Sequence, residues 1–213
     1  MWTVLRKQPT IVLAVWGLLA VEFSVSLFRE RWSLAFVSLA TFGLTLLPIL
    51  FARRFGVRLP TSFLAGIVLF IFATIFLGEA FDFYNRYWWW DIALHSGSAL
   101  GFGLMGFLMI FMMFGGDRYA APPWAVAFFS FCFAVSIGAM WEIFEFAMDQ
   151  LFGLNMQKSG LIDTMWDLIV DCLGAFVGAF SGFLYLKLGK AGLLTGALDA
   201  FVSENRELYR KSK

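Results

Sequence analysis

The sequence predicts an all-α, polytopic integral membrane protein with about six transmembrane helices. Three observations predict this fold: 61% of the 213 residues are hydrophobic, the mean hydropathy is +0.79, and only 15% of the residues are charged. A soluble domain of this length does not carry so much apolar surface. A helix needs about 20 apolar residues to cross about 30 Å of hydrocarbon, and the chain contains six windows of that length.

The first three spans are separated by charged turns. The first has no small-residue cleavage site after it, so we expect a membrane span and not a signal peptide. The turn "RERW" precedes the second span, and the Gly- and Pro-containing stretch "ARRFGVRLP" precedes the third. We therefore expect spans over residues 10–28, 33–51 and 61–78.

The last three spans are bounded in the same way. Three tryptophans, which favour the headgroup layer, stand before the fourth span. The stretches "GGDRYAAPP" and "GLNMQKSG" separate the fourth, fifth and sixth spans. We expect these spans over residues 91–114, 124–148 and 164–186.

These spans are expected to form one helical membrane domain over residues 1–213. It comprises two leading spans (1–60), a four-span core (61–186) and a polar C-terminal tail (187–213). Cys132 and Cys172 lie in different spans without metal-type spacing and read as buried apolar residues. A net charge of +1 gives no indication of nucleic-acid binding, so the expected partners are membrane lipids.

The distribution of basic residues predicts the orientation of the chain. With six spans, the two termini and the second and fourth loops share one side of the membrane. That side holds twelve of the sixteen lysines and arginines. By the positive-inside rule, both termini are predicted to be cytoplasmic, and the basic tail is expected at the cytoplasmic membrane surface.

The acidic residues gather at the ends of the last four spans. In an up-and-down chain these ends share one face, which the charge distribution predicts to be extracytoplasmic. Carboxylates crowded into a low dielectric cannot all stay ionised without cations, so they must hold protons or a metal. Nine of the fifteen acids belong to this set: Glu79, Asp82, Asp91, Glu142, Glu145, Asp149, Asp163, Asp167 and Asp171.

Helical spacing places these groups in stripes. His95, the only histidine, follows Asp91 by four residues. Stripes of this kind can face the interior of the bundle. Small residues continue two of the stripes, which predicts a close approach of the fourth and sixth spans. On the fifth span the stripe consists of Glu142, Glu145 and Asp149, and on the sixth span of Asp163, Asp167 and Asp171. The small residues that continue the stripes are Ala99, Gly103 and Gly106 on the fourth span and Gly174, Gly178 and Gly182 on the sixth.

The stretches "WWWDIALHSGSALGFG", "GAMWEIFEFAMDQ" and "SGLIDTMWDLIVDCLGAFVGAF" resemble the YjdF-like family of bacterial inner-membrane proteins. More distantly, they resemble the VanZ-like proteins, which are linked to glycopeptide-antibiotic resistance. The resemblance covers roughly residues 78–178 and implies a multi-pass protein of the bacterial inner membrane. The resemblance implies no established reaction. The family's polar positions correspond to Asp91, His95, Glu142, Glu145, Asp163 and Asp167.

The chain departs from this family pattern after the histidine. Where the family pattern has an arginine-bearing stretch, this chain has "LGFGLMGFLM". If that basic element binds an anion in relatives, this chain is not expected to do so.

Our first functional hypothesis is a metal-dependent membrane hydrolase or transferase. Carboxylates with one imidazole suit Mg²⁺, Mn²⁺ or Zn²⁺, and the ion would activate water against a phosphorylated or lipid-linked substrate. The expected ligands are His95, Glu142 and Asp167, with Asp163 and Asp171 as further candidates. Asp91 is expected to orient the imidazole, and Glu145 to act as general base.

Two alternatives stay open at this point. In a proton- or cation-coupled transporter the same acids would form a relay, although few acids lie in the cytoplasmic halves of the spans. In a structural or lipid-binding protein, the polar groups would pair with one another and fix the helix register.

Overall fold

The computed structural model describes residues 9–209, and the regular secondary structure in that range is entirely helical. Six helices are long and apolar enough to cross a membrane, which confirms the predicted fold class. The first span has the predicted ends, and the ends of the other five differ from the predicted ends by up to four residues. The orientation of the chain stays a prediction. The spans are Thr10–Phe28, Trp32–Arg54, Thr61–Ala80, Trp90–Met113, Pro123–Phe152 and Leu161–Leu188.

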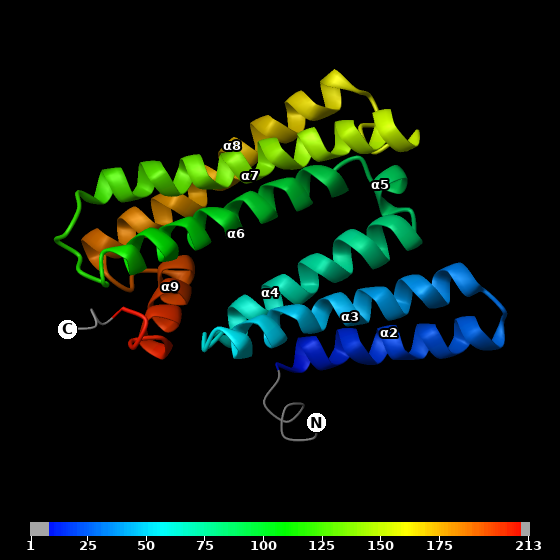
Figure 1. Cartoon of the computed structure of the whole chain (residues 1–213), viewed down its shortest axis with the longest axis horizontal. Helices are drawn as coiled ribbons and strands as arrows, with labels where there is room; N and C mark the ends of the chain where they lie inside the picture. The colour runs from blue at the N-terminus through cyan, green and yellow to red at the C-terminus, as the bar shows by residue number, and fades with distance from the viewer. Residues whose placement is uncertain (1–8, 210–213) are drawn as a thin grey trace. The chain divides into compact units, whose positions relative to one another are not determined.

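The chain divides into two compact units, and the division follows Trp90. The first unit therefore contains three spans, while the sequence analysis groups the third span with the last three. The single-domain organisation stays a prediction. The first unit comprises α2 (Thr10–Phe28), α3 (Trp32–Arg54), α4 (Thr61–Ile71), η1 (Phe72–Ala80) and the short α5 (Phe83–Arg86) (Figure 1).

An apolar core joins the helices of the first unit. Side chains from one face of α2 pack against α4 and η1, because apolar residues three and four apart share a helix face. The α2 side chains in this core are Val12, Val15, Trp16 and Leu19, and their partners are Leu64, Val68 and Phe76.

Buried polar groups in the first unit find partners locally. The indole nitrogen of Trp16 donates a 2.9 Å hydrogen bond to the Thr45 hydroxyl on α3. The hydroxyls of Ser38 and Thr41 each donate to the carbonyl four residues earlier. These bonds remove the cost of burying polar atoms, so the unit is held by ordinary helix packing.

The third span ends as a π-helix, which the sequence analysis did not anticipate. Residues Phe72–Ala80 have this wider winding, which is rare and usually limited to a single turn. Near its end, Gly78 faces the ring of Tyr84, which occupies the space that a side chain at position 78 would fill.

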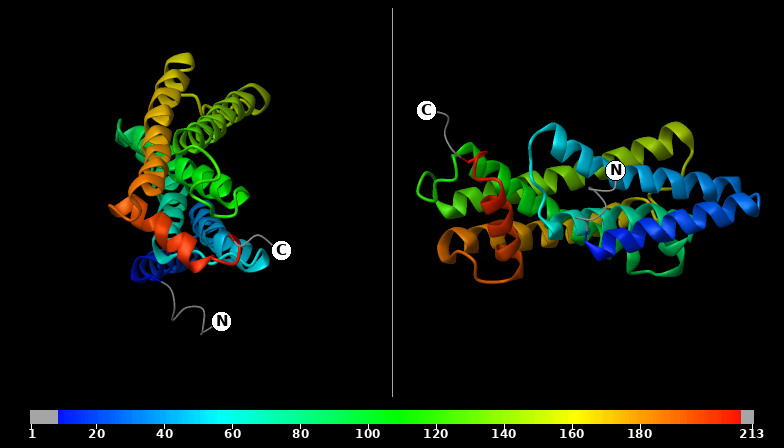
Figure 2. Two further views of the ribbon diagram at one scale, coloured as in Figure 1. Left: turned by 90° about the vertical axis from the view of Figure 1, so that its left-hand side faces the viewer. Right: turned by 90° about the horizontal axis from the view of Figure 1, so that it is seen from below.

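The second unit is a bundle of three long helices and one short one. The helices are α6 (Trp90–Met113), α7 (Pro123–Phe152), α8 (Leu161–Leu188) and α9 (Leu193–Glu204). Figure 1 and Figure 2 show α6, α7 and α8 running alongside one another, with α9 at the end of α8.

Glycines bring the backbones of α6 and α8 into contact. A Cβ atom at Gly174 or Gly178 would clash with the carbonyl oxygen of Ser96 or Leu100, respectively. On α6, a Cβ atom at Gly103 would lie 2.9 Å from the carbonyl oxygen of Ala175. The predicted close approach of the fourth and sixth spans is therefore confirmed. We refer to this contact, made by Ser96, Leu100, Gly103, Gly174, Ala175 and Gly178, as the glycine seam.

Gly106, which the sequence analysis grouped with this stripe, faces α7 instead. A Cβ atom there would lie 3.1 Å from the carbonyl oxygen of Ser130. The reason is geometric: Gly106 follows Gly103 by three residues, which turns it by about 60° around the helix.

The chain after residue 187 is not simply a polar tail. Residues Leu193–Glu204 form α9, in which Leu198 is fully buried, and Tyr209 packs against Phe111 with ring centroids 5.5 Å apart. Burial raises the pKa of the Tyr209 hydroxyl. The helix is shorter than a membrane span, so a search for apolar windows of span length passes over it.

Candidate functional site

His95 lies at the centre of a polar cluster built by α6, α7 and α8. Its Nδ1 atom lies 3.3 Å from Oδ1 of Asp171 on α8. Its Nε2 atom lies 3.8 Å from Oδ1 of Asp91 on α6 and 4.0 Å from Oε1 of Glu142 on α7. The imidazole is thus surrounded by carboxylates from all three long helices of the second unit.

Helix periodicity and the glycine seam explain why these side chains meet. Asp91 and His95 are one turn apart on α6, and Asp167 and Asp171 are one turn apart on α8. Gly174, the next position in the α8 stripe, contacts the backbone at Ser96. Because the backbones are so close there, the short Asp171 side chain can reach the imidazole.

The cluster is withdrawn from solvent, which is unusual for so many acidic groups. The exposed fraction is 8% for His95, 4% for Glu142, 3% for Asp167 and 1% for Asp171. Within residues 9–209, neither carboxylate oxygen of Glu142 or of Asp171 has a hydrogen-bond partner. A buried carboxylate without partners is strongly destabilising, so it needs a proton or a cation to compensate it.

Three members of the cluster lie nearly close enough to one another to hold one metal ion. Asp91, His95 and Asp167 each offer one ligand atom, and these atoms all lie within 4.8 Å of one another. Around one ion with bonds of about 2.1 Å, ligand atoms lie up to about 4.2 Å apart, so a small inward movement would suffice. The unpartnered oxygens of Glu142 and Asp171 offer further coordination from the same cluster.

Gly138 on α7 makes room for the Asp171 carboxylate. A Cβ atom at this position would clash with Oδ2 of Asp171. The glycine lies one turn before Glu142 and so shares its helix face. Gly138 is not among the predicted site residues, although its spacing of four from Glu142 places it on the same helix face.

Glu145 is placed at the edge of the cluster. Its Oε1 atom accepts a 2.9 Å hydrogen bond from the indole nitrogen of Trp141, one turn earlier on α7. The residue is half-buried and interacts electrostatically with Glu142 and His95. Its predicted role as general base stays a prediction.

Asp163 and Asp149 hold the loop between α7 and α8. An oxygen of Asp163 accepts a 3.1 Å hydrogen bond from the backbone N–H of Lys158. The two oxygens of Asp149 accept from the backbone N–H groups of Met156 and Gln157, at 2.7 and 2.9 Å. These contacts give both acids a structural role at the end of the bundle. The predicted metal-binding role of Asp163 stays a prediction.

The structure therefore brings together five of the seven predicted site residues. It also changes the expected pairing, since the carboxylate nearest to the imidazole belongs to Asp171 and not to Asp91. Sequence spacing alone favours Asp91, which lies on the same helix face as His95, whereas the approach of Asp171 depends on contact between two helices. The five residues are Asp91, His95, Glu142, Asp167 and Asp171.

Comparisons with known proteins agree with the membrane architecture. A family model described as "Predicted membrane protein (DUF2238)" matches residues 11–188. An uncharacterized protein of Thermotoga maritima is 28% identical over 109 residues, which cover 51% of this chain and 55% of the relative. This chain thus spans about half of that relative's length. No solved structure matches this chain. The YjdF-like resemblance fits the matching family, and the VanZ-like resemblance stays a prediction.

Proposed function

The chain belongs to the DUF2238 family of predicted membrane proteins, and from that premise we propose that it is a multi-pass membrane enzyme that uses one divalent cation. The cation would be Mg²⁺, Mn²⁺ or Zn²⁺, and the substrate a phosphorylated or lipid-linked molecule. The observation that carries the proposal is the His95 cluster, in which buried carboxylates without hydrogen-bond partners surround a single imidazole.

In this proposal each residue has a distinct task. Asp91, His95 and Asp167 would hold the ion, because their ligand atoms all lie within 4.8 Å of one another. Asp171, whose Oδ1 lies 3.3 Å from Nδ1 of His95, would turn Nε2 toward the ion, as carboxylates beside metal-bound histidines commonly do. Glu142 would complete the coordination from α7, and Glu145 would take a proton from a water molecule that the ion activates.

The position of the cluster near the beginnings of α6 and α8 supports a substrate at the membrane surface. At 1.5 Å per residue, His95 lies about 7.5 Å along α6 from its first residue, and Asp171 about 15 Å along α8 from its first residue. A headgroup near the beginnings of these two helices could reach groups at such distances. An ion held there would polarise a phosphoryl oxygen and lower the pKa of bound water.

The glycine seam favours a site open to one side over a transport relay. Beyond Asp171, α6 and α8 touch through their backbones, and the ionisable side chains of α8 up to Tyr185 are limited to Cys172. A proton or cation relay through this contact would need further polar groups. Transport and a purely structural network are therefore treated as alternative outcomes of the experiment.

The first experiment measures bound metal. The full-length protein is purified in mild detergent, its divalent ions are quantified by mass spectrometry, and its thermal stability is recorded with and without chelator. We expect about one ion per chain in the wild type and almost none in His95→Ala and Asp167→Ala. Asp149→Ala is the matched control, because this acid holds a loop and is expected to leave the ion in place.

The second experiment tests the reaction. Release of phosphate from phosphatidate-containing vesicles and from p-nitrophenyl phosphate is followed with Mg²⁺, Mn²⁺ or Zn²⁺. The proposal expects metal-dependent release that Glu145→Gln abolishes without removing the ion. No bound ion in the wild type, and no effect of any of the three cations on its stability, would overturn the metal site. Cation flux in proteoliposomes that Glu142→Gln abolishes would favour transport instead.

A further inference from the structure

A cavity at one end of the first unit has the chemistry of an anion site. Its volume is about 350 Å³, and it lies where α3 ends, the following loop turns, and α4 begins. The polar side chains that line it belong to Arg53, Arg58 and Thr61, so two guanidinium groups and a hydroxyl share one small space. Guanidinium groups bind phosphate through paired, charge-assisted hydrogen bonds.

Two helix N-termini add to this positive field. Thr61 is the first residue of α4, and Pro9, which also lines the cavity, directly precedes α2. Neither helix has a side-chain hydrogen bond at its N-cap. Their first-turn N–H groups and the positive ends of their dipoles therefore favour an anion at this end of the unit.

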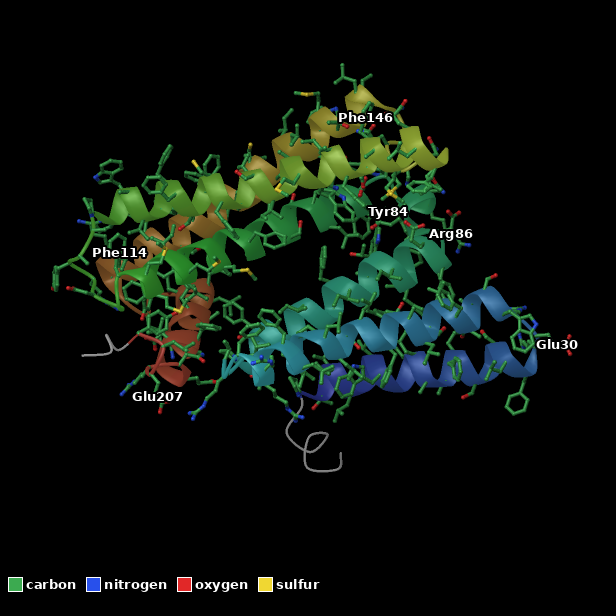
Figure 3. The ribbon with its side chains drawn as sticks, viewed as in Figure 1. Glu30, Tyr84, Arg86, Phe114, Phe146 and Glu207 are labelled. Atoms are coloured by element: carbon green, nitrogen blue, oxygen red, sulfur yellow. The ribbon has the colours of Figure 1, made fainter. Side chains whose placement is uncertain are left out.

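Among the described residues, no acidic side chain lines the cavity. Glu30 is in the turn between α2 and α3, at the other end of both helices (Figure 3). Glu79 and Asp82 follow α4 at the end of η1. These three acids therefore lie at the far ends of their helices from Arg53 and Arg58.

The rest of the lining is apolar and indicates an amphiphilic ligand. Ile49, Ala52 and Leu64 form the wall beside the arginines. A volume of about 350 Å³ is at the lower end of the range for small-molecule sites, so it suits a headgroup and not a whole lipid. The acyl chains would then run outside the cavity along the apolar surface of α3 and α4.

We propose that this cavity binds the phosphate headgroup of an anionic phospholipid. Arg53 and Arg58 hold the phosphate, Thr61 and the N-terminus of α4 donate hydrogen bonds to it, and the apolar wall contacts the glycerol backbone. Under the predicted orientation this end of the unit faces the cytoplasm, the side on which anionic lipids attract basic segments of membrane proteins. The proposal is independent of the metal site, which belongs to the second unit.

Arg54 provides a matched control within the same sequence. It adjoins Arg53 and also lies in the last turn of α3, but its guanidinium carbon lies over the Phe55 ring, 5.8 Å from the centroid, and it does not line the cavity. If the two arginines only complement the negative end of the α3 dipole, replacing Arg53 should change lipid binding no more than replacing Arg54. If the cavity binds phosphate, replacing Arg53 should weaken lipid binding more than replacing Arg54.

The experiment measures lipid binding to the delipidated full-length protein by native mass spectrometry. The probes are phosphatidylglycerol, phosphatidylcholine, glycerol phosphate and inorganic phosphate. We expect the wild type to prefer phosphatidylglycerol over phosphatidylcholine by about tenfold or more, and the soluble phosphates to bind much more weakly. We expect Arg53→Gln/Arg58→Gln to lose this preference and Arg54→Gln to keep it.

Three outcomes would overturn the proposal. The first is equal binding of the two phospholipids by the wild type, which needs no variant and therefore does not depend on variant folding. The second is that Arg54→Gln loses the preference for phosphatidylglycerol to the same extent as the double variant. The third is inorganic phosphate binding as tightly as phosphatidylglycerol, which would indicate a site for a soluble anion. An unchanged metal content in the double variant would show that any loss is confined to the lipid site.

Discussion

The two units bury polar groups in opposite ways. In the first unit, Ser26 is fully buried and donates a 3.0 Å hydrogen bond to Glu22, and Thr45 accepts from Trp16. In the second unit, Glu142 and Asp171 are buried without a hydrogen-bond partner among residues 9–209. The first arrangement stabilises a fold, whereas the second costs stability unless a ligand or proton compensates it. The difference is the reason that we place the proposed reaction in the second unit.

The two units also use glycine differently. Gly17, Gly43 and Gly66 in the spans of the first unit have no atom within 4 Å of the position a Cβ would take. Gly174 and Gly178 in α8 are in backbone contact with α6. Glycine in the second unit thus sets the distance between two helices, and that distance brings Asp171 to His95.

The largest effect is expected from adding a methyl group to the glycine seam. In Gly178→Ala the new Cβ would clash with the carbonyl oxygen of Leu100, and a backbone atom cannot move aside cheaply. We expect the free energy of unfolding to fall by about 3 kcal/mol. In the first unit, Gly43→Ala should leave it unchanged or raise it by up to about 1 kcal/mol. Equal unfolding curves in detergent for the two variants would remove the contrast between the units.

The next effect concerns the position of Asp171. In Gly138→Ala the added methyl group displaces the Asp171 carboxylate, which is a side chain and can move. We expect the affinity for the divalent ion to fall about tenfold, or about 1.4 kcal/mol, in a titration followed by calorimetry. Gly101→Ala on α6, where the space is open, is the control. If the affinity stays within twofold of the wild type, Gly138 has no positioning role.

A smaller effect, of opposite sign in the two units, is expected for neutral replacements of acids. In chelator, Glu142→Gln replaces a buried carboxyl group that has no hydrogen-bond partner among residues 9–209, and it should stabilise the protein by about 1 kcal/mol. Glu22→Gln weakens the acceptor of Ser26 and should be neutral or slightly destabilising. Thermal unfolding of both variants without metal tests this. Destabilisation by Glu142→Gln under those conditions would mean that the carboxylate is already satisfied.

The smallest effect is expected for the acid that holds a loop. Asp149→Ala removes the acceptor for two backbone N–H groups between α7 and α8. Because water can replace these bonds at the helix end, the stability loss should be below about 1 kcal/mol. Hydrogen exchange at Met156 and Gln157 should become faster, while the metal content stays the same. Loss of the ion in this variant would extend the site to the loop.

Much of the architecture follows from local sequence. Six apolar windows predict six membrane helices because each helix must satisfy its own backbone hydrogen bonds in the bilayer. The helical spacing of Asp91 with His95, and of Asp167 with Asp171, fixes which groups share a face. The glycine spacing on α8 predicts close contact with a neighbouring helix. These properties depend only on residues a turn or two apart.

The sequence by itself thus determined the membrane spans, the polar stripes and the seam, but not how the stripes meet. Only the tertiary structure decided that Asp171, and not Asp91, lies nearest to the imidazole and that Gly138 makes room for it. It also showed that α9 is helical and the third span ends in a π-helix. The physical reason is that distances between side chains on different helices depend on how the helices pack, and packing sums many contacts between residues far apart in the chain.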